Sequence, residues 1–173
     1  MALFTPLRSY AMAITLGISP GINVVGLALF KDDSLLHWHT HIFIGTWNGK
    51  KFRRLMNTLD IYMVENRVTA VAIKIPDNYL RKRKMTMLIG GINILCQRAL
   101  IEPTYYTLSQ LKEHFSPGGK IRKNALTAFI AKTYPELMSQ YVVAERAKVY
   151  YYEKMFEAVL AAHTYIKNPS ATS

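Results

Sequence analysis

The first part of the chain alternates short apolar runs with polar or glycine-containing turns, a pattern typical of β-strands. The turns are Ser19-Pro20-Gly21 and Lys31-Asp32-Asp33-Ser34, and the third run is closed by Gly45 and Asn48-Gly49. The strands predicted from this pattern span residues 13–18, 23–30 and 35–44. Because the connections between them are short, we expect the three strands to form an antiparallel meander.

From Gly49 onwards the apolar residues recur mainly at the three- and four-residue intervals of helices, and two short strands interrupt this pattern. The predicted elements are a helix over 52–63, a strand over 69–75, a helix over 85–99, a strand over 104–107, and helices over 108–115, 123–134 and 144–166. Three antiparallel strands followed by alternating helices and strands predict an α/β domain. We expect a mixed five-stranded sheet with helices on both faces.

The length of 173 residues fits one domain, which we place at 13–167, between an N-terminal extension over 1–12 and a polar tail over 168–173. Half of the residues are hydrophobic and 19% are charged, which excludes a wholly disordered or collagen-like chain. The one cysteine, Cys96, excludes an intramolecular disulfide and a thiolate-based zinc site. The chain has no apolar run long enough to span a membrane and a start too weak for a secretory signal, so we expect a cytoplasmic or organellar protein.

The charge of the chain is strongly positive. There are 22 Lys and Arg residues against 11 Asp and Glu residues, which leaves a formal net charge of +11. Such an excess predicts binding to a polyanion, with nucleic acid favoured over an anionic membrane surface.

Five short segments carry motifs whose order along the chain is informative. They are Leu16 to Gly26, which reads LGISPGINVVG; Val71 to Lys74; Gly90-Gly91-Ile92; Tyr105 to Lys123, with its Gly118-Gly119-Lys120 loop; and Glu157 to His163. In this order and spacing they resemble the RuvC-type Holliday junction resolvases of the ribonuclease H-like superfamily, over residues 14–165. The resemblance implies a ribonuclease H-like fold, with three antiparallel strands followed by two parallel ones.

Members of that family cut four-way DNA junctions as dimers, and four acidic side chains hold divalent metals at the scissile phosphate. Two-metal hydrolysis needs such clustered carboxylates because hard cations bind oxygen ligands. At the matching positions this chain has Ser19, Lys74, Lys154 and Glu157, which changes their formal charge from −4 to +1. Such a site is not expected to concentrate Mg²⁺ or Mn²⁺. The resemblance therefore implies a catalytically degenerate member, for which we expect neither a metal nor another cofactor.

Lys74 has two interpretations. Paired with Glu157 or Glu153 it forms a metal-free ion pair, and exposed in a cleft it contacts a phosphate as a point charge. We favour the ion pair, because the end of this strand lies deep in the implied fold. A set formed by Asp77, Glu153 and Glu157 would restore a metal site, but we favour ordinary surface or helix carboxylates at these positions.

Two basic groups lie where the resemblance places the DNA cleft, at the carboxyl edge of the sheet. The first is Arg81, Lys82, Arg83 and Lys84, supported by Arg98, and the second is Lys120, Arg122 and Lys123. We expect both groups to contact phosphates. A third group, Lys50, Lys51, Arg53 and Arg54, is favoured as a solvated helix face, and Tyr150 and Tyr151 are candidates for stacking on bases.

Three functions remain open at this point. The leading one is a RuvC-like protein that binds branched or structured nucleic acid, with DNA favoured, and does not cut it. The second is a working junction endonuclease with displaced carboxylates, which would need Mg²⁺ or Mn²⁺. The third is a structural subunit whose basic face docks into a larger nucleoprotein or protein assembly. Homodimerisation is implied by the resemblance.

Overall fold

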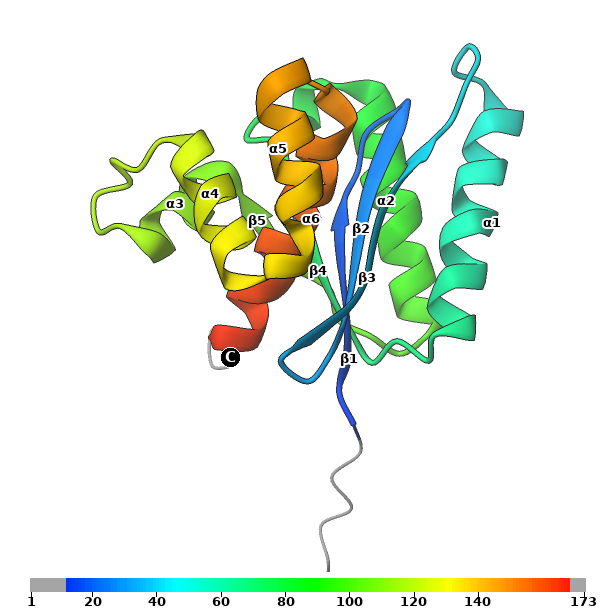
Figure 1. Cartoon of the computed structure of the whole chain (residues 1–173). Helices are drawn as coiled ribbons and strands as arrows, with labels where there is room; N and C mark the ends of the chain where they lie inside the picture. Colours follow the sequence, from blue (N-terminus) through cyan, green and yellow to red (C-terminus); the bar gives the residue numbers. More distant parts are fainter. Residues whose placement is uncertain (1–11, 169–173) are drawn as a thin grey trace, which may run out of the picture.

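Five strands form one mixed sheet at the centre of the structure, a computed structural model that describes residues 12–168 (Figure 1). The strands are β1 (Ile14–Ser19), β2 (Val24–Lys31), β3 (Ser34–Ile42), β4 (Ala70–Ile75) and β5 (Thr104–Thr107). Their order across the sheet is β3-β2-β1-β4-β5, in which β1, β2 and β3 pair antiparallel, while β1, β4 and β5 pair parallel. The predicted sheet is confirmed, with strand bounds within two residues of the prediction. Most of the predicted extension and tail lies outside the described residues.

Helices and two short 3₁₀ turns connect and cover the strands. They are α1 (Gly49–Glu65), η1 (Tyr79–Arg81), α2 (Arg83–Arg98), α3 (Leu108–Phe115), α4 (Lys123–Thr133), η2 (Pro135–Leu137), α5 (Met138–Ala147) and α6 (Tyr150–Lys167). The first four helices predicted from the apolar spacing are confirmed. Among the described residues, no helix is both long and apolar enough to cross a membrane.

The prediction of one continuous last helix over 144–166 is wrong. Lys148 adopts a left-handed conformation, with φ of 49°, and separates α5 from α6. A left-handed residue ends an α-helix because its carbonyl and amide no longer point along the helix axis. Helix α5 contains no buried residue, so its sequence lacks the apolar stripe by which the other helices are recognised.

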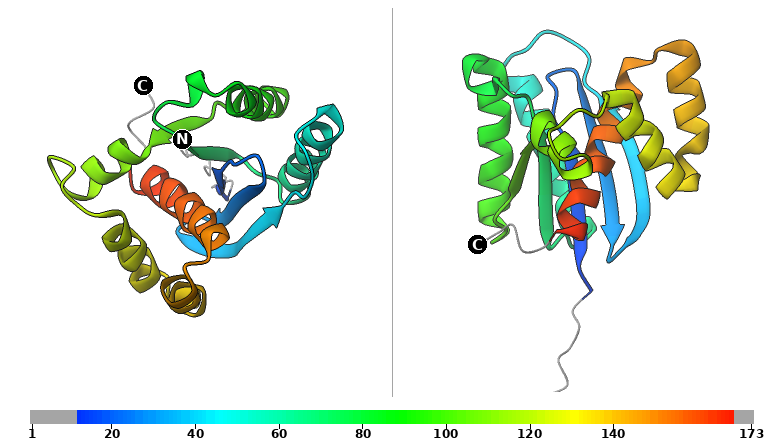
Figure 2. Two further views of the ribbon diagram at one scale, coloured as in Figure 1. Left: turned by 90° about the horizontal axis from the view of Figure 1, so that it is seen from above. Right: turned by 90° about the vertical axis from the view of Figure 1, so that its left-hand side faces the viewer.

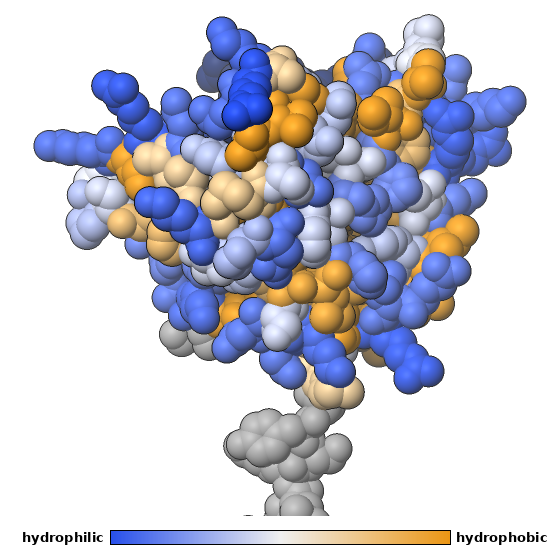
Figure 3. Space-filling view, in the orientation of Figure 1, coloured by the Kyte–Doolittle hydropathy of each residue, from blue (hydrophilic) through white to orange (hydrophobic). Residues whose placement is uncertain are grey.

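The helices form two layers around the sheet (Figure 2). On one face α1 and α2 pack against the apolar side chains of β1 and β4, such as Leu16 and Ile73. On the other face α6 lies between the sheet and α4 and α5, and every residue from Lys154 to Thr164 is buried. The two faces of the sheet therefore bury two separate apolar cores. The outer surface seen in Figure 3 is mainly hydrophilic, with apolar residues in separate groups.

Two glycines allow α6 to approach the sheet closely. A Cβ atom on Gly17 of β1 would overlap the carbonyl oxygen of Ala158, and one on Gly26 of β2 would overlap the carbonyl oxygen of Lys154. Gly26 lies directly opposite Ser19 in the β1–β2 register. The backbone of α6 is therefore seated on the strands beside the end of β1, where the side chains of the candidate site meet.

Candidate functional site

Side chains from two parallel strands and two helices meet at the carboxyl end of β1 and β4. Alternation along each strand points Ser19 and Lys74 to the α6 face, whereas Ile18 and Ile73 point to the opposite core. The residues that meet there, which we call the Glu157 cluster, are Ser19, Lys74, Lys123, Glu153, Lys154 and Glu157. The structure thus brings together all four positions that the resemblance singled out.

Both carboxylate oxygens of Glu157 are occupied by protein donors. The Ser19 hydroxyl donates to Oε2 at 2.5 Å, and Lys154 Nζ lies 3.3 Å from the same oxygen. Lys74 Nζ lies 3.2 Å from Oε1, and Lys123 Nζ donates to Oε1 at 2.9 Å. Lys123 also forms an ion pair with Glu153 on the outer side of the cluster. Lys74 is therefore paired with Glu157, and Glu153 pairs with Lys123.

The electrostatics of the cluster favour a charged Glu157 despite its burial. The residue is 4% exposed, and burial by itself would raise the pKa of its carboxyl group. The attraction of Lys154, Lys74 and Lys123, with the Ser19 hydrogen bond, outweighs burial and lowers that pKa to about 2. For Lys74 burial is the larger effect, and its pKa is lowered although Glu157 acts to raise it.

The Glu157 cluster does not fit a divalent metal ion. Mg²⁺ and Mn²⁺ need several oxygen ligands, whereas protonated lysine amines are hydrogen-bond donors with no lone pair to offer. Three lysines and two carboxylates leave the cluster with a formal charge of +1. Asp77 is exposed, and among residues 12–168 no group of three His, Cys, Asp or Glu side chains is placed to hold a metal ion. The three-acid set of Asp77, Glu153 and Glu157 is therefore not assembled.

A cavity of about 670 Å³ opens over the Glu157 cluster and is walled by basic side chains. Lys82, Arg83 and Lys84, where α2 begins, line it together with Lys74, Lys123 and Lys154. Tyr150, which is 63% exposed, lines it from the start of α6. We call it the site cavity. Its lining combines cations that suit phosphates with an aromatic ring that suits a base.

The other residues predicted to contact nucleic acid do not all lie at the site cavity. Arg81, Lys120 and Arg122 are exposed but do not line the site cavity. Arg98 ends α2 and is separated from Arg83 by the length of that helix, roughly 22 Å, so the expectation that it supports the first basic group is wrong.

Lys123 was expected to contact phosphate, but its ammonium group is held by Glu153 and Glu157. Sequence reasoning missed this pairing because Lys123 lies 30 and 34 residues from the two acids, on a different helix. The basic segment 120–123, at the start of α4, carries no signal that distinguishes a phosphate contact from an internal ion pair.

Comparison with known proteins gives matches by structure alone. No protein-family model matches the sequence, and no curated protein matches it. RuvC of Thermus thermophilus aligns with a TM-score of 0.68 at 16% identity, over 92% of this chain and 97% of that one. The same protein in complex with a Holliday junction substrate aligns with a TM-score of 0.68 at 17% identity, over 88% and 92% of the two chains.

A viral resolvase is also similar in structure. The Fowlpox virus resolvase, solved with its substrate Holliday junction DNA, aligns with a TM-score of 0.56 at 9% identity, over 91% of this chain and 99% of that one. These likenesses cover 88–92% of this chain and 92–99% of the matched chains. The chain therefore has the ribonuclease H-like α/β fold.

Proposed function

We propose that this protein binds branched or structured DNA through the site cavity and does not cleave it by metal-dependent chemistry. The observation that carries the proposal is the pairing of Glu157 with three lysine ammonium groups and the Ser19 hydroxyl. A carboxylate committed to these donors has no free oxygen with which to hold a hard cation. The cations that remain around the cavity rim are then available to phosphates.

The binding half of the proposal is supported by charge and by structural likeness. Lys82, Arg83 and Lys84 are exposed at the rim of the site cavity, and none of them lies within 4.0 Å of a carboxylate in residues 12–168. Two of the structural neighbours were solved with Holliday junction substrates. A four-way junction is therefore the first ligand to test, with a linear duplex for comparison.

The binding test is the salt dependence of affinity, measured by fluorescence anisotropy with a labelled four-way junction and a linear duplex. Each phosphate neutralised by the protein contributes about 0.9 to the slope of log affinity against log salt concentration. We expect Lys82→Gln with Arg83→Gln to lower this slope by about 2. The matched control, Arg67→Gln with Arg98→Gln, removes the same charge from the other ends of α1 and α2. A wild-type protein without salt-dependent affinity for either DNA refutes the proposal and favours the structural-subunit function.

The cleavage half is tested with a supercoiled plasmid and a four-way junction in Mg²⁺ or Mn²⁺. We expect no nicking. Nicking that is lost in Glu157→Ala would establish a working endonuclease instead. A double variant, Ser19→Asp with Lys74→Glu, adds two carboxylates beside Glu157 and removes one ammonium group. We expect it to bind Mn²⁺ by calorimetry where the wild type does not, because the donor set then suits a hard cation.

A further inference from the structure

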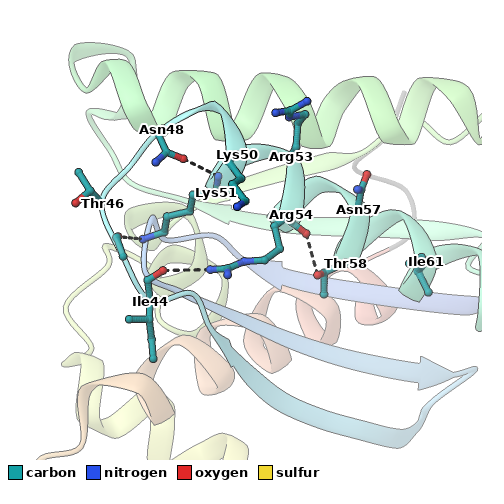
Figure 4. Close-up of a pocket in the computed structure, with 11 residues that line it drawn as sticks. Ile44, Thr46, Asn48, Lys50, Lys51, Arg53, Arg54, Asn57, Thr58 and Ile61 are labelled. Carbon is teal, nitrogen blue, oxygen red and sulfur yellow. Dashed lines mark hydrogen bonds between the residues drawn. The ribbon is translucent and has the colours of Figure 1, made fainter.

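A second cavity, of about 700 Å³, lies away from the Glu157 cluster, between the loop that follows β3 and the first half of α1 (Figure 4). We call it the α1 cavity. Lys50, Arg53 and Arg54 line one side of it, and the loop residues Ile44 and Gly45 line the other. Neither an aspartate nor a glutamate lines it. The α1 cavity is therefore a positively charged hollow.

Two of its basic side chains hold the loop in place. Lys51 is 4% exposed and donates to Asn23 Oδ1 at 2.7 Å and to the Gly45 carbonyl oxygen at 2.8 Å. Arg54 Nη2 donates to the Ile44 carbonyl oxygen at 3.1 Å. Figure 4 shows Lys51 and Arg54 extended toward this loop, and Arg53 pointing away from it. The wall of the cavity is thus formed before any ligand arrives, which lowers the entropic cost of binding.

Lys50 and Arg53 have no such structural partner. Both are exposed, and in the described part of the chain neither lies within 4.0 Å of a carboxylate. The interpretation of this basic group as a solvated helix face is therefore wrong for Lys51, which is buried, whereas Arg54 is exposed and also bonds to the loop. Lys50 and Arg53 are left to receive an anionic ligand.

A third hollow of about 290 Å³ shares lining residues with both the α1 cavity and the site cavity. It is lined by Asn48, which also lines the α1 cavity, and by Arg83 and Lys84, which also line the site cavity. The electrostatics agree with this proximity. Burial, then Arg54 and then Lys84 lower the pKa of Lys51, so a cation at the start of α2 acts on a residue at the start of α1. Both helices begin at the same end of the sheet (Figure 1). The three hollows therefore adjoin one another along a path that crosses the starts of both helices, with basic side chains in each.

We propose that Lys50 and Arg53 in the α1 cavity form a second phosphate-contact site for the same DNA molecule that lies over the site cavity. The inference rests on the proposed function. An extended chain of regularly spaced phosphates matches a path that crosses two helix ends, whereas a small anion would occupy one hollow only. Arginine and lysine side chains without carboxylate partners are the groups that neutralise such a backbone.

The test compares three double variants with the wild type in the same salt titration of a four-way junction and a duplex. In Lys50→Gln with Arg53→Gln we expect the salt slope to fall by about 2, and affinity near 0.1 M salt to weaken roughly 50-fold. Lys82→Gln with Arg83→Gln should behave similarly, and Arg67→Gln with Arg98→Gln should match the wild type. Equal thermal unfolding midpoints exclude a folding defect.

The outcomes separate the two proposals. Suppose that the wild type and the double variant at Lys82 and Arg83 behave as expected. If the double variant at Lys50 and Arg53 then matches the control, only the second phosphate site is overturned. If the wild type shows no salt-dependent affinity, the proposed function fails first. If the Lys50 and Arg53 variant loses affinity for polyglutamate but not for DNA, the α1 cavity is a surface for an acidic protein, and the second phosphate site is overturned.

Discussion

Replacing Glu157 with glutamine should destabilise the protein strongly, because it leaves three ammonium groups around a neutral side chain. The lysines and Ser19 lower the carboxyl pKa from 4.5 to about 2. At 1.36 kcal/mol per pKa unit, the folded protein favours the charged over the neutral form of Glu157 by about 3 kcal/mol more than the unfolded chain does. Removing one partner from a buried ion pair typically costs about 3–5 kcal/mol, in agreement with this value. We therefore expect Glu157→Gln to lower the free energy of unfolding by at least about 3 kcal/mol.

Urea unfolding at pH 7 measures this loss directly, and a pH series tests its origin. Because the folded-state pKa lies below 4.5, the carboxylate stabilises the fold above about pH 4.5. Its contribution is lost as the pH falls from 4.5 towards 2, and Glu157→Gln should lack this part of the pH dependence.

Adding Lys74→Met to Glu157→Gln provides the matched control, since Lys74 is 8% exposed and has lost its carboxylate. We expect the double variant to be more stable than Glu157→Gln alone, because a buried charge without a partner has been replaced by an apolar side chain. A loss below about 1 kcal/mol for Glu157→Gln, the value of an exposed ion pair, would refute the reasoning.

Two further predictions concern the packing and titration of α6. Gly26→Ala should destabilise the protein by about 1–3 kcal/mol in urea unfolding, because the new methyl group displaces the Lys154 backbone. Gly90→Ala in α2, where no atom lies within 4 Å, should instead stabilise it by about 0.5–1 kcal/mol; equal effects of the two would contradict the close approach of α6. His163 is bonded to the Tyr134 hydroxyl at 2.7 Å, and burial lowers its pKa from 6.5 to about 4. Between pH 6.5 and 4 the unfolded state therefore binds a proton at His163 that the folded state does not bind. About 3 kcal/mol of stability should be lost as the pH falls from 6.5 to 4, and His163→Gln should not show this loss.

The elements of the fold were predictable where local patterns are strong. The strands end at turn sequences such as Ser19-Pro20-Gly21, and the helices α1 and α2 carry buried stripes at helical spacing. The prediction was wrong at Lys148, because one left-handed residue in an otherwise helix-compatible segment leaves no mark on the apolar pattern. That residue decides where α6 begins.

The candidate site was predictable only in part. Strand ends and the motif order placed Ser19, Lys74 and Glu157 in one region, and their pairing is what the structure shows. The third cation on Glu157 was unpredictable, because Lys123 comes from α4, which is separated from α6 by α5 in the sequence, and its role depends on how α4 packs. The same holds for Lys51, whose burial follows from the path of the loop after β3.

By itself, the sequence determined the order of the strands and of most helices, the excess of positive charge, and the presence of Ser19, Lys74 and Lys154, which are not acids, at positions to which the resemblance points. These are properties of residue type and spacing, which need no long-range contact. The tertiary structure alone decided which basic side chains pair with acceptors inside the protein and which remain exposed on its surface. Lys51 and Lys123 are held by internal acceptors, whereas Lys50 and Lys82 are exposed. Charge counting cannot separate these two groups, because an ion pair or a hydrogen bond forms only when packing brings its partners within about 3 Å.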